Sequence, residues 1–114
     1  MMQFEVDAAE NVVVLRLRGD VLGGAEGGRL HDELNRLKEG GTHAAVADLG
    51  DVGLMNSSGL GMLIGAMTTL RNVGGDLRLA CVTPRVASLL AITKLTSVFK
   101  QYPTVEDAVA SFSD

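Results

Sequence analysis

Hydrophobic positions along the chain follow two periods, and each period predicts its own kind of element. Alternation of apolar and polar residues, with a period of two, is typical of strands. Apolar residues three and four apart mark one face of a helix. A short continuous apolar run indicates a strand buried on both faces. On this basis the predicted strands are Met2 to Val6, Val12 to Arg18, Ala44 to Leu49, Asp76 to Val82 and Val98 to Tyr102.

Four helices are predicted between and after these strands. The glycine pairs Gly40-Gly41 and Gly74-Gly75 end the first two, of which the second runs from about residue 59 to 73. Thr83 and Thr104 begin the last two, because threonine accepts hydrogen bonds from the free N–H groups of a helix start. The predicted apolar faces are Leu30, Leu34 and Leu37; Leu60, Leu63, Ile64, Met67 and Leu70; Val86, Leu89, Leu90 and Ile92; and Val105, Ala108, Val109 and Phe112.

Polar and glycine-rich stretches are predicted to connect these elements. Asp7 to Asn11 reads as a hairpin connection, and Asp48 to Asp51 as a turn, because aspartate and glycine favour turns. Gly19 to Gly28 holds five glycines. Each glycine within a helix costs about 1 kcal/mol relative to alanine, so the helix start after this stretch is expected to fray. A loose loop here is favoured over a partner-facing segment.

The predicted order of elements is β-β-α-β-α-β-α-β-α. Strands that alternate with helices predict an α/β fold, in which helical crossovers join mostly parallel strands of a mixed sheet. A length of 114 residues fits a single small domain, and no linker or repeat divides the chain, so residues 1–114 are expected to fold together.

Composition narrows the classes of function. Hydrophobic residues make up 46% of the chain and only four are aromatic, so the core must be aliphatic. The net charge is −4 with no Lys/Arg cluster, which argues against nucleic-acid binding. The lone cysteine, Cys81, excludes an internal disulfide, fits a reducing cytosol and is expected to be a small buried residue on a strand. Without a leader-like start or an 18-residue apolar run, we expect a soluble cytoplasmic protein with no membrane span.

The segment from Met55 to Gly61 joins the end of an apolar strand to a helix start and carries two adjacent serines. Asparagine and serine are good helix N-caps, so Asn56 or Ser57 can close the helix start. The same place gathers unpaired N–H groups and the positive end of the helix dipole, which stabilise an anion. A hydroxyl at Ser58 could therefore carry a regulatory phosphate. Local sequence favours capping over the switch, and both interpretations stay open at this point.

The sequence gives little support for a metal site, a catalytic serine or a phosphate-binding loop. His31 and His43 are the only histidines, and the chain lacks the Cys/His spacing of a metal site. Neither histidine is placed as a base for a serine nucleophile, and the serine segment lacks the Gly-x-Ser-x-Gly pattern. The glycines near residue 23 are not followed by the Lys-Ser/Thr of a phosphate-binding loop. The sequence thus indicates no metal and no cofactor, and it disfavours an enzyme.

The residues around the two serines resemble a known family. The run from Asp48 to Gly61 is similar to the signature of STAS domains, the anti-sigma factor antagonists: an acidic strand end, an apolar pair and then Asp-Ser-Ser-Gly-Leu-Gly. The resemblance extends along nearly the whole chain. Further matching segments are Arg18 to Val21, Gly74 to Leu77, Thr83 to Val86 and Val105 to Ala108.

This resemblance implies a function and its partners. Ser58, the second serine, is the phosphoacceptor by position. In the family, an anti-sigma factor with serine kinase activity phosphorylates this serine using ATP, and a phosphatase restores it. The unphosphorylated antagonist binds the anti-sigma factor and so releases a sigma factor, whereas the phosphorylated form does not bind. The alternative is a STAS-type scaffold or accessory subunit, of a transporter or a stress-signalling assembly, whose serine is not phosphorylated.

Five residues beside the phosphoacceptor are expected to contact the partner. Asn56 is expected as the cap and Ser57 as a neighbouring contact, while Gly59 and Gly61 would allow close approach of a partner backbone. Met62 lies outside the predicted apolar stripe, and either the core or an adaptable partner surface accounts for it. Asn56 departs from the family's usual aspartate. Asparagine caps equally well, but a role for the acid in the kinase complex would make phosphorylation slower here.

Overall fold

A computed structural model describes residues 3–9 and 11–113 of the chain. Within those residues it contains five strands and four α-helices, in the predicted order. The elements are β1 (Gln3–Ala9), β2 (Val12–Val21), α1 (Ala25–Glu39), β3 (Ala44–Met55), α2 (Ser57–Arg71), β4 (Asp76–Ala80), α3 (Pro84–Ile92), β5 (Gln101–Tyr102), α4 (Val105–Ala110) and the short 3₁₀ helix η1 (Ser111–Ser113).

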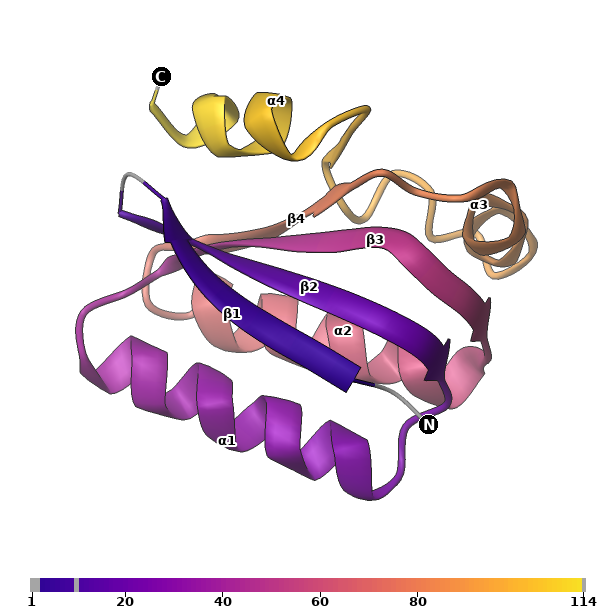
Figure 1. Cartoon of the computed structure of the whole chain (residues 1–114), viewed down its shortest axis with the longest axis horizontal. Coiled ribbons are helices and arrows are strands. Elements are labelled where there is room, and N and C mark those ends of the chain that lie inside the picture. The colour runs from indigo at the N-terminus through magenta and orange to yellow at the C-terminus, as the bar shows by residue number, and fades with distance from the viewer. Residues whose placement is uncertain (1–2, 10, 114) are drawn as a thin grey trace.

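The strands form one mixed sheet in the order β1-β2-β3-β4-β5. β1 is antiparallel to β2, and every other neighbouring pair is parallel. Each parallel connection passes through a helix, as a parallel pair requires, because its chain must return to the starting edge. The prediction of a small α/β domain with a mixed, mostly parallel sheet is therefore confirmed (Figure 1).

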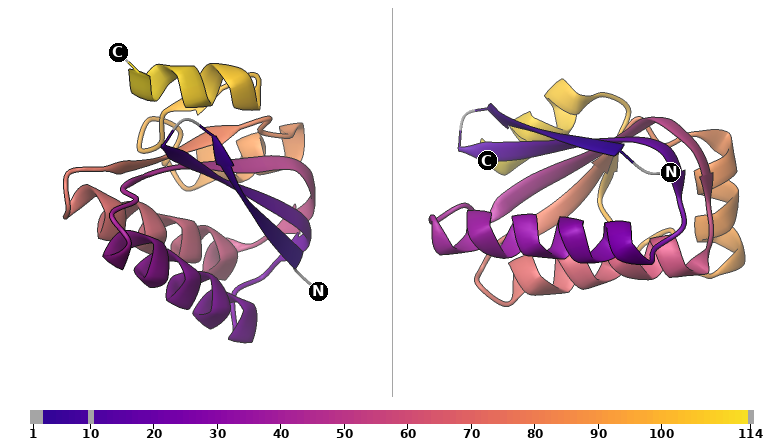
Figure 2. Two further views of the ribbon diagram at one scale, coloured as in Figure 1. Left: turned by 60° about the vertical axis from the view of Figure 1, so that its left-hand side comes forward. Right: turned by 60° about the horizontal axis from the view of Figure 1, so that its bottom comes forward.

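Two helical layers enclose the sheet. α1 and α2 run side by side across one face, and α4 lies across the other (Figures 1 and 2). The larger core lies between the sheet and α1 and α2, and α3 adds Val86 and Leu90 to it. A smaller cluster under α4 comprises Val12, Val14, Val46, Ala80, Ala108 and Val109. The core is aliphatic as predicted, and Phe99 is the one aromatic among the buried residues that the structure describes.

The turn predicted at Asp48 to Asp51 is wrong, because these residues belong to the unbroken strand β3. Arg16 is opposite Asp48 and Arg18 is opposite Asp51, so β3 contains one more residue than β2 over this interval. Such a bulge bends a strand without ending it. The Asp48 side chain accepts a hydrogen bond from the Gly50 N–H at 3.0 Å. The turn-forming chemistry is therefore present, but it shapes a bulge.

The predicted strand at residues 98–102 shortens to Gln101–Tyr102. Its apolar character comes instead from Phe99, which anchors the preceding loop in the core. Ile92, predicted on the buried face of α3, is 79% exposed. Cys81 follows the end of β4 with a φ of 58° and is only partly buried, so the prediction of a buried strand residue is wrong for it. The predicted strand start at Met2, and Glu10 in the hairpin connection, lie outside the described residues.

The glycine-rich segment does not form the long loose loop that its composition predicts. The loop between β2 and α1 is short, and helix α1 begins at Ala25 and includes Gly27 and Gly28. Gly24 occupies the N-cap position without a side-chain hydrogen bond to the helix. Burial of Leu30 and Leu34 against the sheet side of the core favours the helix despite its glycines, since tertiary packing commonly overrides local propensity.

Candidate functional site

The start of α2 is fixed by a side-chain cap. Met55 ends β3 in the core, and Asn56 keeps an extended conformation with φ −111° and ψ −178°. The Oδ1 atom of Asn56 accepts a hydrogen bond from the Gly59 N–H at 2.8 Å. The Asn56 carbonyl then accepts from the Leu60 N–H at 2.9 Å as the first helical bond. Asn56 is therefore the N-cap, so the capping part of the prediction is confirmed, and Ser57 and Ser58 are the first two residues of the helix.

The end of β2 lies directly against this first turn. The Asn56 N–H donates to the Val21 carbonyl oxygen at 3.4 Å. A Cβ placed on Gly59 would lie 2.0 Å from the same oxygen, a distance no side chain tolerates. Gly59 is accordingly buried against the protein's own backbone. Val21 thus fills the Cβ side of Gly59, and a contact between Gly59 and a partner stays a prediction.

The serines face solvent beside the contact between Val21 and Gly59. Ser57 and Ser58 are exposed, as is Gly61, which has nothing within 4 Å of its Cβ position. The N–H groups of the first helical residues have no intrahelical acceptors, and the Asn56 side chain uses only that of Gly59. No acidic residue occupies the first turn of α2. An anion on Ser58 would thus meet unpaired N–H groups and the positive helix end, with no acidic side chain in the first turn to repel it.

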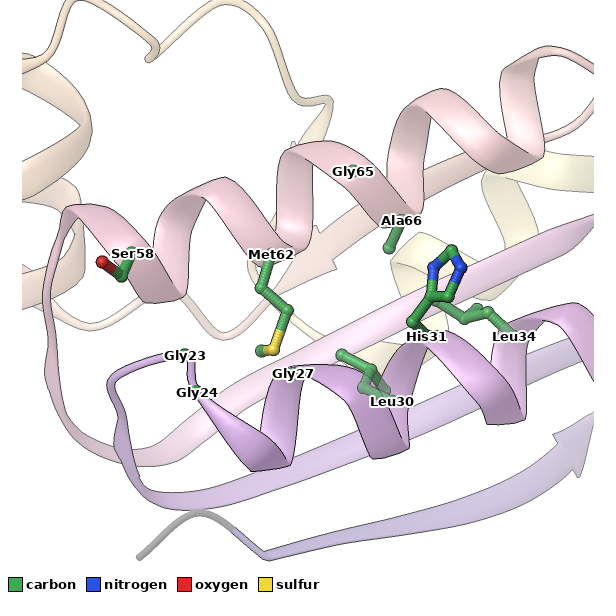
Figure 3. Close-up of a pocket in the computed structure, with 10 residues that line it drawn as sticks. All are labelled: Gly23, Gly24, Gly27, Leu30, His31, Leu34, Ser58, Met62, Gly65 and Ala66. Atoms are coloured by element: carbon green, nitrogen blue, oxygen red, sulfur yellow. The ribbon is translucent and has the colours of Figure 1, made fainter.

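A groove of about 260 Å³ opens between α1 and α2, with Ser58 at one end (Figure 3). Gly23, Gly27, Leu30 and Met62 are among its lining residues. Met62 extends toward Gly27, whose Cβ position is 3.3 Å from the Met62 sulfur. Met62 is half-buried and contacts the core, so it serves core packing and lines the groove as well. Met67 is fully part of the core, as predicted.

The groove could not be recognised in the sequence. Its walls combine residues of α1 and the loop before it with residues of α2, and that pairing depends on how two helices far apart in the chain are placed. His31 also lines it, and its ring nitrogen lies 3.0 Å from the Asn35 side-chain nitrogen. The one available signal was the density of glycines at residues 23–28, which composition alone assigns to a loop.

Ionisable side chains elsewhere in the described part of the chain are the other candidates for chemistry. Among the residues that the structure describes, no three His, Cys, Asp or Glu side chains are grouped to hold a metal ion. Asp48 and Asp51, which the sequence reads as turn residues, lie at the β3 bulge. Burial raises the pKa of the Cys81 thiol, and the neighbouring Asp48 carboxylate raises the pKa further. Cys81 is therefore a poor nucleophile at neutral pH.

The sequence places the chain in a known family. The STAS domain family matches residues 3–108, so the protein belongs to the STAS domain family. A protein of Bordetella bronchiseptica named as a candidate anti-sigma factor antagonist, BtrV, is 29% identical over 111 residues, which span 97% of this chain and 95% of that protein. Within the described ranges, no helix is long and apolar enough to cross a membrane.

Solved structures share the whole fold at lower identity. An anti-sigma factor antagonist from Mycobacterium paratuberculosis superposes with a TM-score of 0.84 at 23% identity, over 100% of this chain and 96% of that one. The anti-sigma factor antagonist SpoIIAA in its unphosphorylated form gives 0.82 at 21%, over 97% and 96%. The phosphorylated form of SpoIIAA, a Bacillus cell fate determinant, gives 0.75 at 20%, over 96% and 99%. At these identities the likeness shows the fold.

Proposed function

We propose that the protein is an anti-sigma factor antagonist, and that phosphorylation of Ser58 switches it off. The unphosphorylated protein binds a cytoplasmic anti-sigma factor that is also a serine kinase, and this releases a sigma factor. A phosphatase returns the phosphorylated protein to the binding state. The observation that carries the proposal is Ser58 itself: an exposed hydroxyl at the second position of a capped helix, with free N–H groups and no acid in the first turn.

The proposed partner surface surrounds that hydroxyl. Asn56, Ser57 and Gly61 are exposed on the first turns of α2, and Met62 borders the groove beside them. A phosphate in the middle of this surface would add about −1.5 to −2 charges that the interface must desolvate. The proposed role is therefore binding and release. It needs no cofactor and no catalytic groups of the chain's own.

Phosphorylation of purified variants tests the site. Anti-sigma-type serine kinases of the same organism, supplied with ATP and Mg²⁺, should add one phosphate to the wild type. Ser58→Ala should abolish the addition, whereas Ser57→Ala should leave it measurable, because only the second serine is the acceptor. Peptide mass spectrometry locates the phosphate. A phosphate on Ser57, or on Thr104 at the capped start of α4, would overturn the assignment.

Calorimetric titration of the partner separates the switch from a scaffold. Ser58→Ala should bind the anti-sigma factor like the wild type, and the phosphorylated protein should bind about a hundredfold more weakly, a loss of ~3 kcal/mol. Ser58→Asp should lose part of that affinity, because a carboxylate carries less charge than a phosphate. Equal affinity of all four forms would favour a STAS-type scaffold or accessory subunit whose serine is not regulatory.

A further inference from the structure

The loop between β2 and α1 passes close to the proposed phosphoacceptor at Gly23. Gly23 has a φ of +83°, in the left-handed region. A Cβ built on Gly23 would lie 3.1 Å from the Ser58 Cβ and 3.3 Å from the Ser58 carbonyl carbon. Figure 3 shows the Gly23 backbone beneath the first turn of α2, with the Ser58 hydroxyl directed away from the groove. The bare Cα of Gly23 therefore lies directly beside the Ser58 side chain.

Neither side of this contact can move away freely. The first turn of α2 is held by the Asn56 cap and by the hydrogen bond from the Asn56 N–H to Val21. The loop is held as well, because Val21 lies two residues before Gly23 and its carbonyl oxygen fills the space beside Gly59. A loop shift large enough to admit a side chain at residue 23 would pull Val21 from that contact. The strain would therefore fall on the Ser58 side chain and the turn that carries it.

We propose that Gly23 is a positioning residue for Ser58. With no side chain of its own, Gly23 lets the first turn of α2 seat against the loop and keeps the Ser58 hydroxyl pointing to solvent. The inference deepens the proposed function and rests on it where Ser58 is treated as the reacting group. The contact between Gly23 and Ser58 does not depend on the proposed function. A misplacement of a reacting group by 1 Å can cost about a hundredfold in rate, so a small displacement matters.

Gly23→Asn with Gly74→Asn as its control gives a sharp test. Asparagine is several-fold enriched at positive φ, so it fits the backbone of both sites better than alanine does. Gly74 has a φ of +85° and nothing within 4 Å of its Cβ position, at the opposite end of α2. Both variants add the same side chain at nearly the same positive φ. Only Gly23→Asn adds a Cβ beside Ser58.

Two measurements then read out position and rate. Hα–Hβ couplings from NMR give the rotamer populations of the Ser58 side chain, and we expect Gly23→Asn alone to redistribute them. In the kinase reaction, Gly23→Asn should lower kcat about tenfold while KM stays within about twofold, since position affects the chemical step more than encounter. Gly74→Asn should match the wild type in both. Thermal midpoints of the two variants show whether their stabilities are comparable.

Each outcome decides the proposal. Unchanged Ser58 couplings in Gly23→Asn would overturn it, and so would an equal change in both variants, which would indicate backbone strain alone. A lower kcat without altered couplings would also contradict it, because the loop would then act by touching the kinase. If no kinase phosphorylates the wild type, the proposed function fails, and the couplings still decide whether Gly23 places Ser58.

Discussion

At the scale of single residues, Gly59 and Gly61 differ sharply although both belong to the serine segment. Gly59→Ala should destabilise the protein by about 1–3 kcal/mol or more, because its Cβ would collide with the Val21 carbonyl oxygen. Gly61→Ala is the matched control in the same helix. With open space around it, alanine there should stabilise the protein by up to about 1 kcal/mol. Urea unfolding of the two variants measures the difference, and equal midpoints would contradict the close contact at Gly59.

Cys81 allows a second residue-scale prediction, based on its raised pKa. A higher pKa means less thiolate at a given pH, so Cys81 in the folded protein should react with iodoacetamide at pH 8 several-fold more slowly than in urea. Burial is the main cause of the shift and Asp48 adds to it, so Asp48→Asn should recover part of the rate. Alkylation followed by mass spectrometry measures both. A folded rate equal to the unfolded one would show that the thiol is not protected.

At the scale of elements, two substitutions at the cap of α2 test different roles of this position. One tests the contribution of the Asn56 cap to stability, and the other tests whether an acid here assists the kinase complex. Asn56→Ala removes the hydrogen bond to Gly59 and should cost about 1 kcal/mol. Asn56→Asp can form the same bond and should change the free energy of unfolding by only a few tenths of a kcal/mol. Thermal unfolding compares them, and equal losses in both variants would argue against the cap. Faster phosphorylation of Asn56→Asp than of wild type would give the acid a role in the kinase complex.

Elements with a clear period were predictable from the sequence, and those shaped by tertiary packing were not. The apolar stripe of α2 and the threonine caps of α3 and α4 are local signals, and all three appear in the structure. The bulge at Asp48 carries the residues of a turn, so composition could not separate the two. Phe99 was predicted in a strand because a buried loop residue is apolar in the sequence just as a buried strand residue is.

The candidate site divides in the same way. The cap at Asn56 and the position of Ser58 at a helix start follow from residue types at neighbouring positions, and the sequence contained both. The contacts of Gly23 and Gly59 join β2 and its loop to α2, some 35 residues away in the chain. No local pattern distinguishes a glycine required by such a contact from a glycine in a flexible loop. The groove between α1 and α2 escaped prediction for that reason.

At the scale of the whole molecule, alternation of strands and helices was enough to predict a mixed, mostly parallel sheet, although not the order of the strands within it. Parallel neighbours joined by helical crossovers leave few arrangements open, and the observed sheet follows the order of the chain. In such a sheet the carboxyl ends of the parallel strands lie at one edge. β2 and β3 both end there, which is why Val21 and Met55 are opposite each other beside the start of α2. The proposed switch thus sits where two strand ends pack against a capped helix start.

The cap and the close packing of this helix start predict that phosphorylation acts locally. Asp51 is four strand residues before Met55, on the order of 13 Å along β3 at ~3.3 Å per residue. Salt screens exposed charges over ~10 Å at 0.1 M, so repulsion between Asp51 and a phosphate at the start of α2 offsets only part of the favourable dipole contribution. The favourable helix-dipole contribution is ~0.3–1 kcal/mol, small against a domain stability of about 5–15 kcal/mol. Phosphorylation should therefore leave the thermal midpoint nearly unchanged.

Amide hydrogen exchange on both forms tests this whole-molecule prediction. Differences should be confined to about residues 50–65 and to the loop at Gly23 that contacts them. The strand β4 makes a suitable internal control. It is buried on both faces, and Asp76 ties it to Arg71 of α2 at 2.8 Å, so it would respond if the helix as a whole moved. Faster exchange in β4 or in α4 would mean that the phosphate acts through a rearrangement of the core, and that partner release does not arise from the altered surface alone.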